Sequence, residues 1–190
     1  VYTAPHLRIG NRPEETLQTI EQAVSSVLDA ERIPVGLGGE HSLTVGMVRA
    51  FTSRYKELTV LQLDAHADLR NEYLDSKWNH ACTARRLLEL APVVGVGIRN
   101  LSKEEAEFAR DRNLDIFYAQ EIRRRRRWEA VVGRLNRNVY VTIDLDVFDS
   151  GIMPSVGTPE PGGLDWYEAL ELIRLVARER NIVGFDAVEL

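Results

Sequence analysis

Apolar stretches of strand length alternate with helix-like segments along nearly the whole chain. The predicted strands are Ile33–Leu37, Thr59–Leu63, Val93–Val96, Asp115–Tyr118, Val139–Ile143 and Ile182–Val188. The predicted helices are Pro13–Ala30, Leu43–Ser53, Ala81–Leu90, Ser102–Arg112, Ile122–Leu135 and Trp166–Arg180. Several strands are continuously apolar, which is typical of parallel strands covered on both faces. The alternation therefore predicts an α/β fold, in which helices flank a mainly parallel sheet joined by right-handed crossovers.

The length of the chain bounds its organisation. A chain of 190 residues is long enough for one domain with a full core, so we expect a single α/β domain over residues 1–190. The sequence starts at Val1 without a methionine and stops at Leu190, directly after the last predicted strand. We therefore expect the domain to lack segments at both ends.

Charge and cysteine content exclude several classes of partner and location. The formal net charge is −5 at pH 7, so we expect neither nucleic acid nor an anionic membrane as the partner. The arginine run Arg123–Arg127 is interpreted as a solvated helix face, with a nucleic-acid contact as the alternative. Cys82 is the only cysteine, which excludes an intrachain disulfide. No stretch resembles a signal peptide or could span a bilayer, so a cytoplasmic location is expected.

Polar clusters follow three of the predicted strands. They read GGEHS at residues 38–42, DAHAD at 64–68 and DLDVFD at 144–149. In parallel sheets, ligands bind at the carboxyl ends of the strands, so the three clusters are expected to meet at one edge. Asp64, His66 and Asp68 would share one face of an extended backbone. Taken alone, this triplet fits either a metal site or an acidic loop at a strand exit.

The combined set of polar residues favours a metal centre over an acidic loop. Six side chains offer oxygen or nitrogen ligands and no sulfur: His41, Asp64, His66, Asp68, Asp144 and Asp146. The four carboxylates carry a charge of −4, which two divalent ions would neutralise. Oxygen ligands together with imidazole suit Mn²⁺, and suit Fe²⁺, Co²⁺ or Zn²⁺ less well. Two ions roughly 3.5–4 Å apart can turn a shared water into hydroxide near neutral pH, which predicts hydrolysis.

Three stretches of the sequence resemble, in order, the signature regions of the ureohydrolase family. They are GLGGEHSLTVG at 36–46, LQLDAHADLR at 61–70 and VTIDLDVFDSGIMPSVGTPEPGG at 141–163. VVGVGIRN at 93–100 and VGFDAVEL at 183–190 also match in order, so the resemblance covers nearly the whole chain. It implies a three-layer arginase-like α/β fold, a site with two Mn²⁺ ions per chain and assembly into trimers or hexamers.

The resemblance also implies roles for individual residues. One manganese ion would be bound by His41, Asp64, Asp68 and Asp144. The other would be bound by Asp64, His66, Asp144 and Asp146, so that Asp64 and Asp144 are shared. His80 would carry a proton during catalysis, and Glu189 would hold the guanidinium of the substrate. Without the resemblance, His80 would be a polar residue at a helix start and Glu189 a carboxylate at a strand end.

Two of the matching stretches depart from the family pattern. Glu40 stands in GGEHS where many members have aspartate, and Ser150 and Gly151 stand where the family commonly has proline after the aspartate. Asp149 matches an aspartate of the family that is not a metal ligand.

The implied activity is cleavage of a guanidino group to urea and an amine by a binuclear metal hydrolase. The loop LRNEYLDSKWNHAC at 69–82 resembles agmatinases and lacks the pattern with which arginases read an α-amino acid. We therefore expect agmatine to be converted to putrescine and urea, a step of polyamine biosynthesis. Guanidinobutyrase or arginase activity and a non-catalytic assembly subunit are the alternatives. A one-metal amide hydrolase is a third, which the presence of Asp68 and His41 disfavours.

Overall fold

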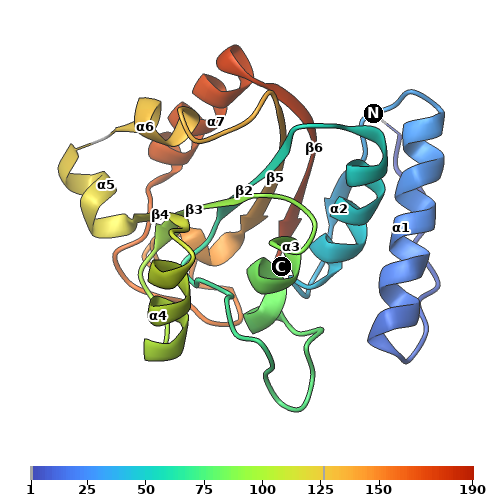
Figure 1. Ribbon diagram of the computed structural model, residues 1–190, viewed down its shortest axis with the longest axis horizontal. Helices are drawn as coiled ribbons and strands as arrows, with labels where there is room; N and C mark the ends of the chain where they lie inside the picture. The colour runs from blue at the N-terminus through green and yellow to red at the C-terminus, as the bar shows by residue number, and fades with distance from the viewer. Residues whose placement is uncertain (1, 126) are drawn as a thin grey trace.

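The computed structural model describes residues 2–125 and 127–190, and in this part of the chain it contains a single parallel sheet (Figure 1). The strands are β1 (Val35–Leu37), β2 (Leu58–Leu63), β3 (Val93–Ile98), β4 (Asp115–Tyr118), β5 (Asn138–Asp144) and β6 (Asn181–Val188). Their order in the sheet is β1-β6-β5-β2-β3-β4, and every adjacent pair is parallel. The predicted mainly parallel sheet is confirmed.

Helices cover both faces of this sheet, as the alternation predicts. They are α1 (Pro13–Asp29), α2 (Leu43–Arg54), α3 (Thr83–Leu87), α4 (Lys103–Asp111), α5 (Ala119–Arg125), α6 (Trp128–Val132) and α7 (Trp166–Glu179). Two short 3-10 turns, η1 (His80–Cys82) and η2 (Leu145–Val147), follow the loops at the carboxyl end of the sheet. α1 and α2 lie on one side of the sheet, and α5, α6 and α7 lie on the other (Figure 1).

The core is divided between the two faces because successive strand residues point in opposite directions. Leu58 and Val60 of β2 pack with the buried face of α1 and α2. Leu61 and Leu63 pack instead with α6 and α7. All six residues of β2 are buried, including the polar Thr59 and Gln62, as expected of a central strand covered on both faces.

Three predicted elements differ from the structure. The predicted helix Ile122–Leu135 is wrong, because α5 and α6 are separate helices and Arg127 before α6 has a non-helical backbone. Like charges one turn apart destabilise a continuous helix, and Trp128 turns into the core. Of the Arg123–Arg127 run, residue 126 lies outside the described residues, whereas Arg123, Arg124 and Arg127 are exposed.

The other two differences occur beside prolines. β1 begins at Val35 and not at Ile33, because Pro34 has no N–H with which to pair. α3 ends at Leu87, and the residues that follow form a turn before Pro92, where helical backbone is disfavoured.

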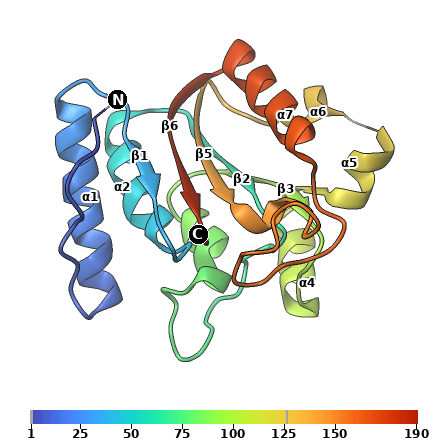
Figure 2. The ribbon, with the colours of Figure 1, turned by 180° about the vertical axis from the view of Figure 1, so that it is seen from behind.

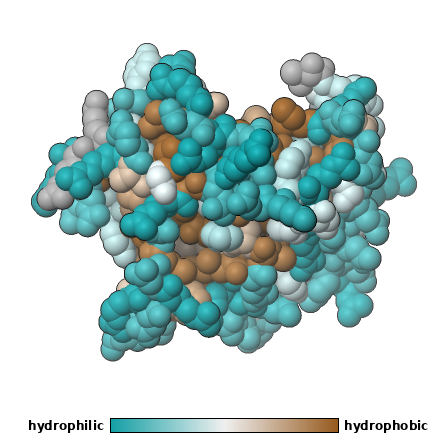
Figure 3. Space-filling view, turned by 45° about the horizontal axis from the view of Figure 1, so that its top comes forward, coloured by the Kyte–Doolittle hydropathy of each residue, from teal (hydrophilic) through white to brown (hydrophobic). Residues whose placement is uncertain are grey.

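One part of the sheet has no helix over it. Val35, Leu37 and Phe185 are exposed, and Val35 of β1 is in register with Phe185 of β6. β1 is the edge strand and lies far from α7 (Figure 2). Elsewhere, polar side chains cover the projecting helices and apolar side chains gather in the recess between them (Figure 3). In the described part of the chain, no helix is long and apolar enough to cross a membrane.

Candidate metal centre

The strand order brings the predicted site residues together. β1, β6, β5 and β2 are consecutive in the sheet, so the segments that follow their carboxyl ends lie side by side. His41 follows β1, Asp64 follows β2, Asp144 ends β5 and Glu189 follows β6. The chain end after β6 lies at this edge of the sheet (Figure 2).

His41 lies at the centre of the first group of ligands. Its side chain is 0% exposed, and its Nδ1 atom lies 3.3 Å from Oδ2 of Asp64 and 3.2 Å from Oδ2 of both Asp68 and Asp144. None of these contacts has hydrogen-bond geometry, and Nδ1 has no hydrogen-bond partner among the described residues. A buried nitrogen that faces three carboxylate oxygens without bonding to any of them is the arrangement expected of ligands that hold a cation between them.

His66 belongs to a second, adjacent group. Its Nδ1 atom lies 2.8 Å from Oδ2 of Asp146 and 3.8 Å from Oδ1 of Asp64. Asp64 belongs to both groups, one with His41 and Asp144 and the other with His66 and Asp146. Within each group, the potential ligand atoms lie within 4.8 Å of one another. The two groups thus share a carboxylate, as expected of a binuclear centre.

Backbone and amide donors hold these carboxylates in place. The N–H of His66 donates to Oδ1 of Asp64 at 2.6 Å, and the Gln62 amide donates to its Oδ2 at 2.7 Å. The N–H of Asp146 donates to Oδ1 of Asp144 at 3.0 Å, and the N–H of Ala65 donates to Oδ1 of Asp146 at 2.9 Å. Loop bonds and not strand alternation set the positions of Asp64 and Asp68, since β2 ends at Leu63.

The electrostatics of the first group show that it is short of positive charge. Burial, with the charges of Asp68 and Asp144, raises the pKa of Asp64 well above its ordinary value. Burial alone would lower the pKa of His41, but the close carboxylates of Asp144, Asp64 and Asp68 raise it well above its ordinary value. Within the described residues, no lysine or arginine forms an ion pair with these aspartates. Four carboxylates and two imidazoles, without sulfur, fit hard or borderline divalent ions.

His80 and Glu189 lie beside the metal-ligand candidates. A cavity of about 190 Å³ is lined by His66, His80 and Glu189, and by the aspartates Asp68, Asp144 and Asp146. Glu189 accepts a hydrogen bond from the N–H of His41 at 2.8 Å, and burial raises its pKa. The structure therefore brings all eight predicted site residues to one edge of the sheet.

Glu40, the residue that departs from the family pattern, contacts His80. Its Oε1 atom accepts a hydrogen bond from the N–H of His80 at 2.6 Å and lies 3.6 Å from the imidazole Nδ1. The contact with Glu40 raises the pKa of His80, whose side chain is 45% exposed at the mouth of the cavity. His80 is thus held by its backbone, and its ring can still reach solvent.

The loop from Asp149 to Gly163 forms one wall of the site. Asp149 accepts hydrogen bonds from the N–H groups of Gly151, Gly162 and Gly163 at 2.9, 2.7 and 3.2 Å. Thr158 of this loop donates to Oδ2 of Asp146 at 3.3 Å. The loop therefore helps to position Asp146, a predicted metal ligand, although none of the predicted ligands lies in the loop itself.

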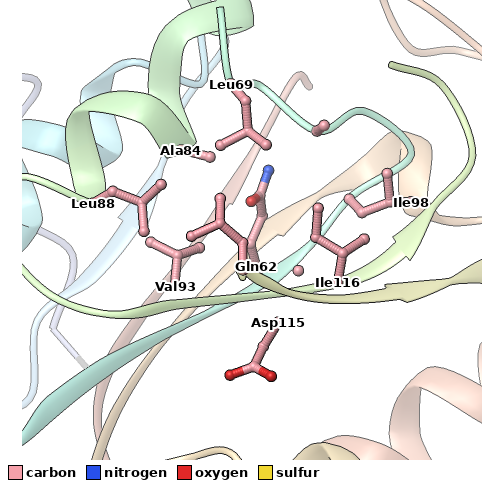
Figure 4. A pocket seen from close by; sticks show the side chains of 11 residues that line it. Gln62, Leu69, Ala84, Leu88, Val93, Ile98, Asp115 and Ile116 are labelled. Carbon is pink, nitrogen blue, oxygen red and sulfur yellow. The ribbon is translucent and has the colours of Figure 1, made fainter. Parts of the chain in front are cut away.

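A second, much smaller cavity lies beneath the centre and is not a candidate for substrate. Its volume is about 10 Å³, which is room for about one water molecule. The Gln62 side chain points into it among apolar side chains, whereas Asp115 points to the other side of the sheet (Figure 4).

Sequence reasoning missed several residues that support the centre. They are Gln62, Thr142, Thr158 and Asp186. Asp186 carried a usable signal, since it is an acidic residue inside the apolar run of β6 and is wholly buried. Thr142 and Gln62 carried none, because their contacts depend on neighbouring strands.

Comparison with known proteins gives a consistent match. The sequence model that describes the arginase family matches residues 1–190 of this chain. A protein of Synechocystis sp. named N(1)-aminopropylagmatine ureohydrolase is 42% identical over 88% of this chain and 56% of its own length. The agmatinase of Pyrococcus horikoshii is 36% identical over 91% of this chain and 59% of its own length.

Solved structures agree with these sequence matches. The agmatine ureohydrolase of Thermoplasma volcanium has a TM-score of 0.84 at 36% identity, covering 95% of this chain and 62% of that chain. The chain thus spans little more than half the length of the first curated relatives, at 56% and 60%.

Proposed function

This chain belongs to the arginase family, and from that premise we propose that it carries the catalytic centre of a binuclear-metal ureohydrolase. The reaction would cleave a guanidino group to urea and an amine. The observation that supports it most strongly is the buried His41 Nδ1, unbonded and facing three carboxylate oxygens. A non-catalytic relative would have no reason to keep this arrangement, which is costly to bury.

We assign the metal ligands as the sequence predicts. His41, Asp64, Asp68 and Asp144 would hold one ion, and Asp64, His66, Asp144 and Asp146 the other, with Mn²⁺ as the proposed metal. When bound, such a pair supplies hydroxide as the nucleophile near neutral pH. The aspartates fix the position of this centre through the backbone bonds that they accept.

Two further residues act on the substrate. The Glu189 carboxylate would offset the charge of the guanidinium and orient it, because it lies in the cavity while its other contact, the His41 N–H, fixes it. Glu40 raises the pKa of His80, so this imidazole keeps its proton to a higher pH than a free one would, and His80 would give that proton to the nitrogen of the departing amine.

Agmatine is the proposed substrate, with putrescine and urea as products. The cavity wall contains Tyr73, Arg70 and Glu105, and the Arg70 guanidinium lies 3.9 Å from the Glu105 carboxylate and 5.0 Å from the centre of the Tyr73 ring. Because Glu105 offsets the charge of Arg70, this wall suits a cationic amine better than the carboxylate of arginine or guanidinobutyrate. N(1)-aminopropylagmatine is a second candidate, because the relative from Synechocystis sp. bears that name and is 42% identical.

A urea-release assay tests this proposal. The full-length protein, loaded with Mn²⁺, would be given agmatine, N(1)-aminopropylagmatine, 4-guanidinobutyrate and arginine. We expect urea from one of the first two substrates, with a higher kcat/KM than for arginine, and loss of urea release in Glu189→Gln. A preference for arginine would contradict the substrate assignment, and no urea from any compound would contradict the catalytic one.

We also propose that the full-length protein is a trimer or hexamer. The support for this is the family resemblance together with the uncovered apolar residues Val35, Leu37 and Phe185, since large exposed apolar patches mark contact surfaces. Sedimentation velocity of the full-length protein tests it, and a stable monomer would contradict it.

A further inference from the structure

A buried row of polar side chains connects His41 to Asp186. His41 Nε2 lies 2.9 Å from Oγ1 of Thr142, which lies 3.3 Å from Oγ1 of Thr44. Thr44 donates to Oδ2 of Asp186 at 2.9 Å. All four residues are 0% exposed and come from the loop after β1, from β5, from α2 and from β6. The row lies behind the imidazole ring, on the side away from the three carboxylates that face Nδ1.

The direction of each hydrogen bond in this row follows from its acceptor end. The Asp186 carboxylate accepts from Thr44 and, at 2.6 Å, from the Tyr140 hydroxyl. Each hydroxyl has one proton to give. Because Thr44 gives its proton to Asp186, its oxygen can only accept from Thr142. Thr142 has then used its proton and must accept one from His41.

The consequence for His41 is a fixed tautomer. The imidazole proton lies on Nε2, which donates to Thr142, and the lone pair of the neutral ring lies on Nδ1. That lone pair points at the centre of the three carboxylate oxygens, where a metal ion would be held. With the opposite tautomer, the ring would present a proton to the metal instead of a lone pair.

We propose that Asp186 is a positioning residue of the metal centre, which fixes the metal-binding tautomer of His41 through Thr44 and Thr142. This inference rests on the proposed metal centre but not on the proposed substrate. Asp186 is wholly buried, and its Oδ2 atom accepts hydrogen bonds from the hydroxyls of Thr44 and Tyr140. A merely structural role, tying α2 to β5 and β6, is the competing explanation.

Manganese affinity separates the two explanations. Mn²⁺ would be titrated into the metal-free full-length protein, with free Mn²⁺ followed by electron paramagnetic resonance. Thr142→Val keeps the shape of the side chain but removes the hydroxyl, and Thr142→Ser restores it. Thr59→Val is the matched control, because Thr59 is an equally buried strand threonine whose hydroxyl bonds to the N–H of Asn136, away from His41.

We expect Thr142→Val and Asp186→Ala to weaken binding of the tighter ion by roughly 10- to 100-fold, the usual effect of losing the partner of a ligating histidine. Thr142→Ser and Thr59→Val should stay within about twofold of the wild type.

The inference is overturned if Thr142→Val binds Mn²⁺ like Thr59→Val while both lose thermal stability. If Asp186→Ala does not fold, the Thr142 pair alone decides the result. Failure of the proposed function would look different, because the wild-type protein itself would then bind no manganese or release no urea.

Discussion

At the scale of single residues, the aspartates of the centre have histidines as their only ion-pair partners among the described residues. Backbone N–H groups bind one oxygen each of Asp144 and Asp146, whose other oxygens face His41 and His66. Both oxygens of Asp64 accept a hydrogen bond, one from the N–H of His66 and one from Gln62. Carboxylates that are this close and this buried repel one another unless a cation lies between them. Loss of one ligand should therefore affect metal binding before it affects the fold.

Asp144→Ala should be the most damaging single change in the site. The residue faces His41, and its other oxygen accepts the N–H of Asp146, so both groups of ligands lose order. Loss of a residue that only supports a metal ligand lowers metal affinity by about 10- to 100-fold. Loss of the ligand Asp144 itself should therefore lower manganese affinity by more than about 100-fold. Isothermal titration of the full-length variant measures it, with Asp115→Ala on β4 as the control. Wild-type affinity in Asp144→Ala would exclude Asp144 as a ligand.

His80→Ala should lower kcat by about 100-fold or more and leave manganese affinity nearly unchanged. The imidazole is directed to the mouth of the cavity and contacts Glu40 instead of the aspartates. Turnover and metal content would be measured on the same preparation. A loss of metal in this variant would show that His80 is a ligand and that its assigned role is wrong.

Manganese affinity should rise with pH between about 6.5 and 8.5. Burial disfavours the charged form of His66, but its hydrogen bond to Asp146 and the nearby carboxylates raise its pKa to about 9. In the metal-free protein His66 therefore holds a proton below about pH 9, which an incoming ion must displace. Each displaced proton strengthens apparent binding by up to about tenfold per pH unit. An affinity that is independent of pH would contradict the protonated state of His66.

At the scale of elements, the alternation of apolar and helical segments predicted all six strands, with their bounds within two residues of those observed. The largely apolar composition of β2 already indicated a central strand covered on both faces. Sequence patterns could not predict that the chain breaks between α5 and α6, because the burial of Trp128 depends on contacts with α7. They also could not pair Thr142 with His41 or Asp186 with Thr44, because those contacts join segments about 100 residues or more apart.

The wall formed by residues 149–163 offers a test at this scale. A Cβ atom on Gly163 would lie 2.4 Å from the carbonyl carbon of Phe148 and 2.5 Å from the nitrogen of Asp149. Gly163→Ala would therefore push the loop away from η2 and should lower the free energy of unfolding by about 1–3 kcal/mol. Gly39→Ala is the control, since a Cβ there meets nothing within 4 Å. Denaturant unfolding of both variants measures the difference, and equal stability would contradict the close packing of this loop.

At the scale of the whole molecule, the sheet order explains why distant segments make one site. Residues from the ends of four adjacent strands meet because those strands are parallel and neighbouring, although they are far apart in the chain. The sequence predicted which residues would meet, and the structure adds the buried row behind His41 that orients one of them. The uncovered faces of β1 and β6 leave apolar side chains available for contact with further polypeptide.

The central claim is that six side chains form one binuclear centre, and metal content tests it most directly. The full-length protein would be stripped of metal, reconstituted with Mn²⁺, freed of excess ions and analysed by elemental mass spectrometry against protein concentration. The two groups of ligands joined by Asp64 predict close to two manganese ions per chain. A content of one ion per chain that persists in excess Mn²⁺ would contradict the binuclear centre.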